Sequence, residues 1–336
     1  MGYKFPMKNR QALYFEAPNQ VSIHEEPMPV PAEDQAFVRT HISAISAGTE
    51  MLFYRGQFPK DLAVDENITF LQEQQAEYPL KYGYAAVGVI EKVGENFPEF
   101  LLGKRVFSFQ AHQSHFLAKE SELFLIPDDI SNEEAVFMPN METALNLVMD
   151  ARPLIGERLI VFGQGIIGLL TTALLAKFPL KRLVVVDPYP LRRKTALSLG
   201  ADEALAPGAV EDGNFDLALE LSSVPDALNQ AIGKVGFGGR VIVGSWYGQK
   251  PVSLDLGGRF HRNRIQLISS QVSTIAPNLS GRWDKPRRFE LVWEMLRQVR
   301  PGKLISLRIP LGEAEQAYRT LDTRPEDLLQ VVFEYS

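Results

Sequence analysis

Three closely spaced glycines carry the clearest chemical signal in this sequence. Gly163, Gly165 and Gly168 follow the apolar run 158–162, and a second apolar segment starts at Leu169. In such a pattern the first glycine permits a tight turn, the second lets backbone N–H groups approach a pyrophosphate, and the third lets a helix pack closely on a strand. The helix N-terminus then faces the phosphates. We therefore predict a dinucleotide-binding loop made of Gly163, Gln164, Gly165, Ile166, Ile167 and Gly168.

An acidic residue suggests which dinucleotide this loop binds. Asp187 ends the next apolar run, 182–186, which has the character of a strand. A carboxylate at this position accepts hydrogen bonds from the adenosine ribose hydroxyls and repels a 2′-phosphate. The sequence therefore favours NAD(H) over NADP(H). Arg192 and Arg193 lie nearby and could soften that preference, or they could simply begin a solvated helix.

The composition limits the possible functions. The chain has 336 residues, 45% of them hydrophobic and 23% charged, with a net charge of −6. These values are typical of a soluble globular protein of two domains and give no basic stripe for nucleic acid. We expect a cytoplasmic protein, because no apolar run resembles a signal peptide or reaches membrane-spanning length. The chain has no cysteine, which excludes disulfides, thiolate nucleophiles and thiolate metal ligands.

The two halves of the chain have different element patterns. Short β-type runs separated by turns fill 11–119, which predicts a compact β-barrel-like domain interrupted by an acidic insert at 60–77. A helix is expected from Ser131, with Glu134 completing a capping box, to about residue 150. From residue 157 strands and helices alternate, which predicts a doubly wound parallel sheet of about six strands.

The C-terminal tail should return to the first domain. Helices are expected near 286–299 and 313–321, and a strand near 329–334. A tail of this size cannot bury its own apolar faces, so we expect it to dock onto the N-terminal β domain. The expected domains are 1–150, 151–270 and the return segment 271–336.

In order and spacing, these features resemble the medium-chain dehydrogenase/reductase superfamily over nearly the whole chain. The matching segments are 46–50 (SAGTE), 54–56 (YRG), 79–84 (PLKYGY), 93–94 (VG), 103–107 (GKRVF), the glycine loop and 199–202 (LGAD). The resemblance implies a GroES-like catalytic domain around a Rossmann domain. It also implies that Gly244 and Ser245 hold the nicotinamide, that Glu220, Ser222 and Ser223 lie near the ribose, and that a homodimer forms through the edge strand at 265–268.

The chain departs from the zinc-using members of this superfamily. Their three ligand positions fall here on Ala47, Tyr84 and, approximately, Met138, and none of these side chains binds Zn²⁺ usefully. The four-cysteine structural zinc site is missing too. We therefore expect no metal. The Gly-Thr-Glu turn and the Gly83-Tyr84 pair resemble a cysteine-poor subgroup that includes bacteriochlorophyllide hydroxyethyl dehydrogenase, although we do not carry its tetrapyrrole substrate over.

Without zinc, a side chain has to neutralise the charge that develops on the substrate oxygen. Thr49 is the first candidate, because the matching family hydroxyl contacts that oxygen, although it could also cap a helix. Tyr84 is the second and could donate from its phenol or merely fill the metal cavity. Glu50 could accept a hydrogen bond from Tyr84 or substrate, or form a salt bridge. His115 could carry protons to solvent, although a lone histidine is more often structural.

The leading hypothesis is a zinc-independent, NAD(H)-dependent oxidoreductase acting on a secondary alcohol or its ketone, with a small molecule as its substrate. Two alternatives stay open. One is an NAD(P)H-dependent quinone or enone reductase, and the other is a non-catalytic dinucleotide-binding sensor or scaffold. The basic run 258–264 could attract an anionic substrate or form a solvated or subunit-facing loop.

Overall fold

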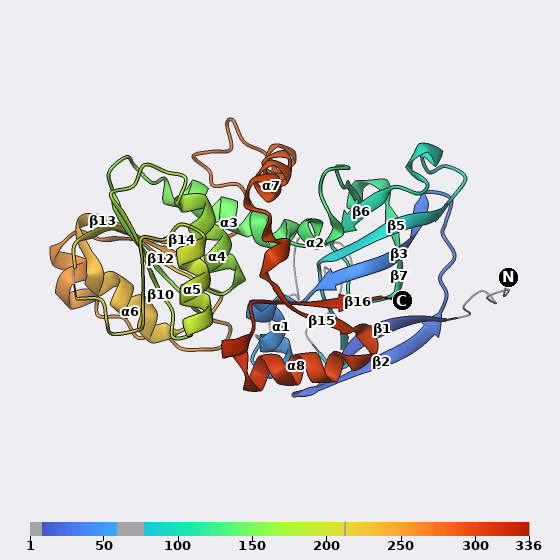
Figure 1. The fold of residues 1–336 in the computed structure, drawn as a ribbon, viewed down its shortest axis with the longest axis horizontal. Helices are drawn as coiled ribbons and strands as arrows, with labels where there is room; N and C mark the ends of the chain where they lie inside the picture. The colour runs from blue at the N-terminus through green and yellow to red at the C-terminus, as the bar shows by residue number, and fades with distance from the viewer. Residues whose placement is uncertain (1–8, 59–76, 212, 336) are drawn as a thin grey trace. The chain divides into compact units, whose positions relative to one another are not determined.

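The computed structural model describes residues 9–58, 77–211 and 213–335, so most of the expected insert at 60–77 lies outside the described residues. The chain divides into two compact units. Unit 1 comprises 1–138 and 302–336, and unit 2 comprises 139–301. Figure 1 shows the order of the elements along the chain. No helix among the described residues is both long and apolar enough to cross a membrane.

Unit 1 contains two sheets. One has the order β2-β1-β4, and the other has the order β15-β16-β3-β5-β6-β8, with β7 pairing with β3. Their strands are β1 (Asn9–Ala17), β2 (Gln20–Pro27), β3 (Gln35–Ala44), β4 (Leu80–Lys81), β5 (Ala86–Val93), β6 (Arg105–Ser108), β7 (His115–Lys119), β8 (Phe124–Leu125), β15 (Ile305–Pro310) and β16 (Gln330–Glu334). Its helices include α1 (Ala47–Tyr54), α2 (Asn132–Ala135) and α8 (Ala314–Thr323).

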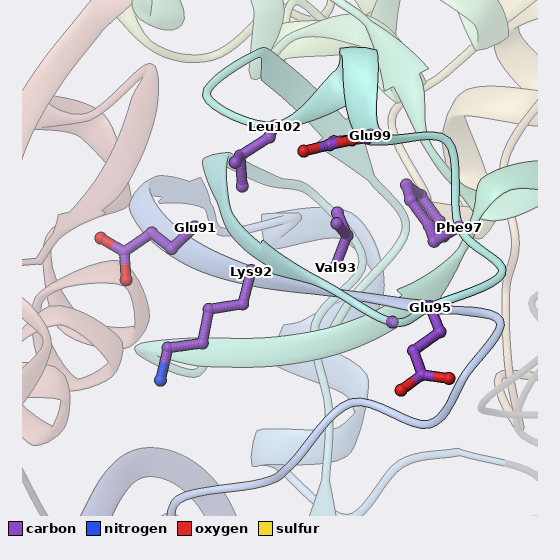
Figure 2. Close-up of a pocket in the computed structure, with 8 residues that line it drawn as sticks. Glu91, Lys92, Val93, Glu95, Phe97, Glu99 and Leu102 are labelled. Carbon is purple, nitrogen blue, oxygen red and sulfur yellow. The ribbon is translucent and has the colours of Figure 1, made fainter.

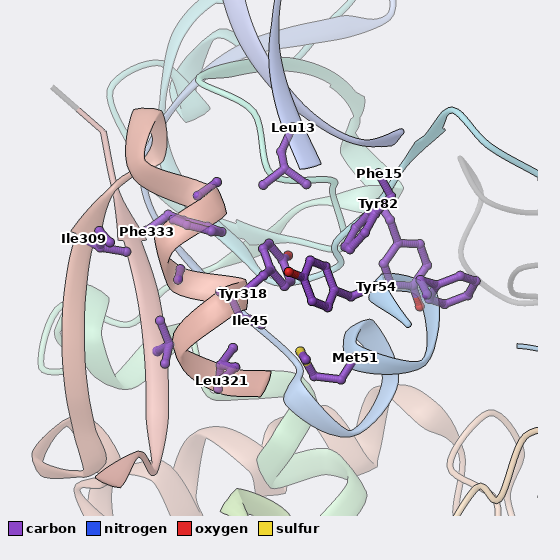
Figure 3. Packing of buried hydrophobic residues seen from close by; sticks show 14 of the residues in the cluster. Leu13, Phe15, Ile45, Met51, Tyr54, Tyr82, Ile309, Tyr318, Leu321 and Phe333 are labelled. Atoms are coloured by element: carbon purple, nitrogen blue, oxygen red, sulfur yellow. The ribbon is translucent and has the colours of Figure 1, made fainter. Parts of the chain in front are cut away.

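The two ends of the chain share one core in unit 1. Strand β16 pairs antiparallel with β3, where Val332 lies opposite Ala44. Helix α8 adds its apolar face, and its Tyr318 packs edge-on against Phe15 of β1. Figure 3 shows this cluster, in which side chains from the first 82 residues interleave with those from 309–333. The core therefore depends on contacts between segments that are very distant in sequence.

Unit 2 has the doubly wound arrangement predicted from the sequence. Its six-stranded sheet has the order β11-β10-β9-β12-β13-β14, and all neighbouring strands are parallel. The strands are β9 (Arg158–Phe162), β10 (Arg182–Val186), β11 (Glu203–Leu205), β12 (Phe215–Glu220), β13 (Val235–Val243) and β14 (Gln266–Ser269). The strand order reverses between β9 and β12, and ligands of such sheets bind outside the carboxyl ends of the strands at that point.

The helices of unit 2 are α3 (Met138–Ala151), α4 (Ile166–Leu175), α5 (Pro190–Ser198), α6 (Pro225–Lys234) and α7 (Lys285–Val299). The expected single helix after Ser131 is divided into α2 and α3, because Pro139 has no N–H with which to continue the first helix. The capping box at Ser131 is present: its hydroxyl accepts the N–H of Glu134 at 3.2 Å.

The division into units differs from the expected boundaries at 150 and 270. A fully buried arginine in α7 explains why 271–301 packs with unit 2. Arg288 donates to the carboxylate of Glu142 at 2.6 Å and to Asn146 Oδ1 at 2.6 Å, both on α3. Burial raises the pKa of Glu142, and the charge of Arg288 opposes that shift. These bonds hold α7 on α3 within unit 2.

Candidate active site

The glycine loop connects β9 to α4, and its three glycines meet different demands. Gly163 has φ +92°, and a Cβ there would lie 2.7 Å from the carbonyl carbon of Leu221. A Cβ on Gly168 would lie 2.0 Å from the carbonyl oxygen of Gly163. A Cβ on Gly165, by contrast, would meet no atom within 4 Å. The fold therefore requires the first and third glycines, whereas the second leaves open backbone of the kind a pyrophosphate needs.

Asp187 holds this loop in place. Its carboxylate is 2% exposed and accepts the N–H of Gln164 at 2.7 Å and that of Tyr189 at 2.9 Å. Each carboxylate oxygen has a further lone pair that could accept a hydrogen bond from a ribose hydroxyl. Arg192 Nη1 lies 3.9 Å from the carboxylate, and Arg193 donates to the backbone carbonyls of Asp187 and Pro188. Arg193 therefore supports the turn after β10.

The remaining loop residues support the turn from inside. Gln164 is fully buried, and its side chain accepts the hydroxyl proton of Thr172 at 3.0 Å and donates to the carbonyl of Gly163 at 3.1 Å. Ile166 and Ile167 are half-buried in the first turn of α4. Gln164 is thus a brace between loop and helix, and its side chain is not exposed to a ligand.

A second cluster forms where β12 and β13 end. The fully buried carboxylate of Glu220 accepts the N–H of Ser222 at 2.7 Å and also the hydroxyl protons of Ser222 and Tyr247. Burial, and then the bond to Glu220, raise the pKa of Tyr247 well above its usual value. Ser245 Oγ accepts the N–H of Ser223 at 2.8 Å. The loops after the two strands are therefore tied together by one carboxylate.

Gly244 has a packing role in this cluster. A Cβ there would lie 2.5 Å from a methyl carbon of Leu147 and 2.6 Å from one of Leu221. The residues expected to hold the two ends of a dinucleotide, Asp187 near the first and Ser222, Gly244 and Ser245 near the second, all follow strands of one parallel sheet. The donor set and the open face at Gly165 fit a dinucleotide.

In unit 1, Thr49 lies in the first turn of α1 and is half-buried. Its N–H donates to the carbonyl of Ser46 at 3.0 Å. The phenol of Tyr84 donates to the hydroxyl of Ser46 in a short hydrogen bond. The structure therefore brings Tyr84 to the same turn that carries Thr49, with Ser46 at its start.

Of the partners expected for Glu50, Tyr84 does not bind it, whereas a salt-bridge partner, His112, lies within ion-pair distance. Its fully buried carboxylate accepts the N–H of Ser46 at 2.7 Å, lies 3.0 Å from His112 Nε2 and accepts the phenol proton of Tyr318. The hypothesis of a hydrogen bond from Tyr84 to Glu50 is wrong, because Tyr84 bonds Ser46 and donors from two distant segments occupy the carboxylate. Burial, and then the charge of Glu50, raise the pKa of Tyr318 well above its usual value.

The hydrogen-bonded string continues beyond His112. Its Nδ1 lies 2.7 Å from the hydroxyl of Ser43, which in turn lies 2.7 Å from the phenol oxygen of Tyr335. Burial raises the pKa of Tyr335 well above its usual value, so this phenol stays protonated. The string joins α1, β3 and the chain end inside unit 1.

His115 lies in a different setting from the one expected. It is 5% exposed, stacks on Phe37 at 5.2 Å and has Nδ1 3.0 Å from the hydroxyl of Ser114. Burial lowers the pKa of His115, which favours the neutral ring. A role in carrying protons to solvent does not fit this packing, and the histidine bound to Glu50 is His112.

The three positions that the resemblance assigns to zinc ligands lie in or against the protein core. Ala47 and Tyr84 pack against the core cluster of Figure 3, and Met138 is fully buried. Within the described residues, no group of three or more His, Asp and Glu side chains forms a metal-binding cluster.

A surface pocket lies elsewhere in unit 1. It has a volume of about 390 Å³ and is lined by Glu91, Lys92, Val93, Gly94, Glu95, Phe97, Glu99 and Leu102, as Figure 2 shows. None of the candidate catalytic residues lines it.

Sequence reasoning gave no role to His112, Tyr318 and Tyr335, and it placed Ser46 in the matching turn without assigning it a function. Of the first three, only His112 had a local signal, since it stands three residues before His115 in the same polar segment. The two tyrosines reach Glu50 and Ser43 through tertiary structure that no local pattern encodes.

Comparison with known proteins places this geometry among dehydrogenases. No family model matches the chain. D-guloside 3-dehydrogenase of Escherichia coli K12 is 22% identical over 321 residues, covering 88% of this chain and 91% of that protein. (R,R)-butanediol dehydrogenase of Bacillus subtilis is 27% identical over 59% of this chain and 65% of its own length.

Solved structures agree on the fold. The RspB alcohol dehydrogenase of Escherichia coli CFT073, complexed with NADH, superposes with a TM-score of 0.80 at 18% identity and covers 98% of this chain and 100% of its own. The 2R,3R-butanediol dehydrogenase of Bacillus subtilis superposes with a TM-score of 0.79 at 18% identity and covers 97% of this chain and 100% of its own. The predicted fold class is confirmed, and the chain is an alcohol dehydrogenase-like oxidoreductase with GroES-like and Rossmann domains.

Proposed function

We propose that this protein transfers hydride between NAD(H) and a secondary alcohol or its ketone without a catalytic zinc ion. The observation that carries the proposal is the glycine loop. Gly165 has open space where a Cβ would stand, and the buried carboxylate of Asp187 accepts the N–H of the preceding residue, Gln164. A bound nicotinamide would supply or accept the hydride.

The cofactor residues follow from this loop. Gly165 and the first N–H groups of α4 would hold the pyrophosphate, and Asp187 would accept the adenosine ribose hydroxyls. Ser222, Gly244 and Ser245 would hold the nicotinamide half. One structural neighbour is an NADH complex, and another, a zinc-binding dehydrogenase of Sinorhizobium meliloti, is an NADP complex. The buried carboxylate supports NAD(H) for this chain, because it would repel a 2′-phosphate.

The chemistry would depend on hydroxyl groups. Reduction of a ketone places negative charge on its oxygen, which zinc stabilises in zinc enzymes. Here Ala47, Tyr84 and Met138 stand at the ligand positions, so the hydroxyl of Thr49 would donate a hydrogen bond to that oxygen and the phenol of Tyr84 would supply the proton. The same substitutions support membership of the zinc-less subgroup. The relatives named for guloside, butanediol and threonine oxidation support a hydroxylated small-molecule substrate.

The test is turnover by metal-stripped protein. Purified enzyme is dialysed against a chelator, its metal content is measured, and it is assayed with NADH and NADPH against diols, polyol glycosides, ketones, quinones and enones. We expect alcohol or ketone turnover without stoichiometric zinc and a preference for NADH. Activity that returns only with added zinc would contradict the proposal. Quinone or enone reduction with NADPH would favour the reductase alternative, and NADH binding without turnover would favour a sensor.

The hydroxyl roles are tested by Thr49→Val and Tyr84→Phe. Each should lower the rate of hydride transfer by roughly tens-fold while leaving NADH affinity nearly unchanged, because the cofactor loop is in the other unit. Stopped-flow measurement of NADH oxidation gives the rate, and fluorescence titration gives the affinity. Normal rates in both variants would rule out this assignment.

A homodimer through β14 is a further part of the proposal. Strand β14 is an edge of the six-stranded sheet, and its Leu267 is 38% exposed. Phe237 on the neighbouring β13 is 77% exposed. An exposed edge with apolar side chains favours pairing with a second copy. Leu267→Lys should shift the mass measured by light scattering toward the monomer, and an unchanged mass would locate the interface elsewhere.

A further inference from the structure

Ser46 begins helix α1 without capping it. A serine at this position normally accepts an N–H from the second or third helical residue. Ser131 does so at the start of α2, where its hydroxyl accepts the N–H of Glu134. The hydroxyl of Ser46 makes no such bond and instead accepts the phenol proton of Tyr84. The side chain of Ser46 is therefore committed to a tyrosine rather than to its own helix.

The backbone of Ser46 is fixed by other groups. Its N–H donates to Glu50 Oε1 at 2.7 Å, and its carbonyl accepts the N–H groups of Thr49 at 3.0 Å and Glu50 at 2.8 Å. Glu50 in turn is bound by His112 and Tyr318 within the buried core. Ser46 is thus held from one side by a buried network, which fixes the direction of its side chain.

One hydrogen-bonding capacity of Ser46 remains. A hydroxyl has one proton to donate and two lone pairs to accept with. Tyr84 uses one lone pair, and among the described residues no hydrogen bond uses the proton of Ser46 Oγ. The residue as a whole is half-buried, so it is not enclosed in the core as Glu50 is.

From these contacts we infer that Ser46 is a catalytic residue that donates its hydroxyl proton to the substrate oxygen, with Tyr84 as the source of the replacement proton. This inference rests on the proposed function. In ketone reduction a bound reduced nicotinamide would supply the hydride to the carbonyl carbon, and the oxygen would gain the proton of Ser46. The C=O double bond becomes a single bond, Tyr84 reprotonates Ser46, and solvent reprotonates Tyr84. Alcohol oxidation runs the same transfers in reverse.

The experiment compares Ser46→Ala and Ser46→Thr with Ser131→Ala, which makes the same change at a serine that does cap its helix. Ser46→Ala should lower kcat at least tenfold, with thermal stability and NADH affinity near those of the wild type. Ser46→Thr should restore most of the rate, because it keeps the hydroxyl. Ser131→Ala should lower stability and leave kcat unchanged.

Solvent isotope effects test whether Tyr84 supplies the replacement proton. Two protons that move together, from Tyr84 to Ser46 and from Ser46 to substrate, should give a curved dependence of rate on the deuterium fraction in the wild type and a linear one in Tyr84→Phe. A wild-type rate in Ser46→Ala overturns the inference and leaves the proposed function intact. A rate loss no larger than the loss of folded protein also overturns it. A wild type that binds NADH but transfers no hydride overturns both.

Discussion

Among the described residues, each unit of this protein contains one fully buried carboxylate bound by a tyrosine phenol. Glu50 in unit 1 accepts hydrogen bonds from the Ser46 N–H, from His112 and from Tyr318. Glu220 in unit 2 accepts them from the N–H and hydroxyl of Ser222 and from Tyr247. A fully buried carboxylate is tolerated only where several donors surround it, and both sites meet that condition.

The two carboxylates differ in where their donors come from. Tyr318 is 268 positions from Glu50 in the sequence, and His112 is 62 positions away. The donors of Glu220 are 2 and 27 positions away. Glu50 therefore joins both ends of the chain in one core, whereas Glu220 shapes two neighbouring loops at the carboxyl ends of β12 and β13. A similar set of bonds joins distant segments in one unit and, in the other, orders the loops that we propose hold the nicotinamide.

The largest effect is expected for Glu50→Ala. It leaves His112, the Tyr318 phenol and the Ser46 N–H without their acceptor in a dry core, so unit 1 should lose about 3–5 kcal/mol. All three tryptophans of the chain (Trp246, Trp283 and Trp293) lie in unit 2. Urea unfolding followed by tyrosine and circular dichroism signals should shift to lower denaturant while the tryptophan transition moves much less.

Glu50→Gln is the matched control for that prediction. It keeps the volume and one acceptor oxygen, so its loss should be clearly smaller than that of Glu50→Ala. If the two variants lose equal stability, the charge of Glu50 contributes more to the stability of unit 1 than its hydrogen bonds to distant segments do.

The same difference explains what could be predicted from the sequence. The glycine loop, Asp187 and the strands of unit 2 are encoded in local runs, so their positions follow from pattern and spacing. Thr49 and Tyr84 were predicted from the resemblance, and the structure brings them to one turn. The partners of Glu50 could not be predicted, because Tyr318 and His112 reach it only through the packing of α8 and the β domain. Arg288, which holds α7 on α3, is a long-range contact of the same kind.

The next largest effect tests the proposed cofactor loop of unit 2. Gly165→Ala should weaken NADH binding about tenfold or more, because the new methyl group occupies the open face while the backbone, at φ −63° and ψ −177°, accepts alanine without strain. Gly233→Ala in α6, where a Cβ also meets nothing within 4 Å, is the control and should bind NADH normally. Titration of the two variants by calorimetry compares them, and equal affinity would show that this face is not the phosphate site.

Removing the tyrosine hydroxyl that binds each carboxylate tests the difference between Glu50 and Glu220 directly. Tyr318→Phe should cost unit 1 about 1–2 kcal/mol, because the hydroxyl is lost from a dry core. Tyr247→Phe should leave the stability of unit 2 nearly unchanged, since Ser222 still binds Glu220, but should weaken NADH binding roughly threefold by loosening the loop that follows β13. Unfolding curves and NADH titrations on both variants provide the measurements. The opposite pattern, with stability lost in Tyr247→Phe and affinity lost in Tyr318→Phe, would reverse the roles assigned to the two carboxylates.

The smallest effect concerns a third carboxylate, Glu26, whose neighbours include cations. Burial alone would raise its pKa, but the bonds from Tyr14 and Lys81 and the charge of Arg10 outweigh burial and lower the pKa to about 2. A lowered pKa means that the stability it contributes is present above its ordinary value of 4.5 and is lost as the pH falls toward 2. The stability that Glu26 contributes is limited, because its side chain is 19% exposed to solvent. It is limited also because burial and the charge of Arg10 lower the pKa of its partner Lys81. Between neutral pH and about pH 3.5, the free energy of unfolding should therefore fall further in the wild type than in Glu26→Gln. The difference between the two proteins should be less than about 1 kcal/mol. Parallel acid dependence of the two proteins would show that these cations stabilise the folded sheet no better than they stabilise the unfolded chain.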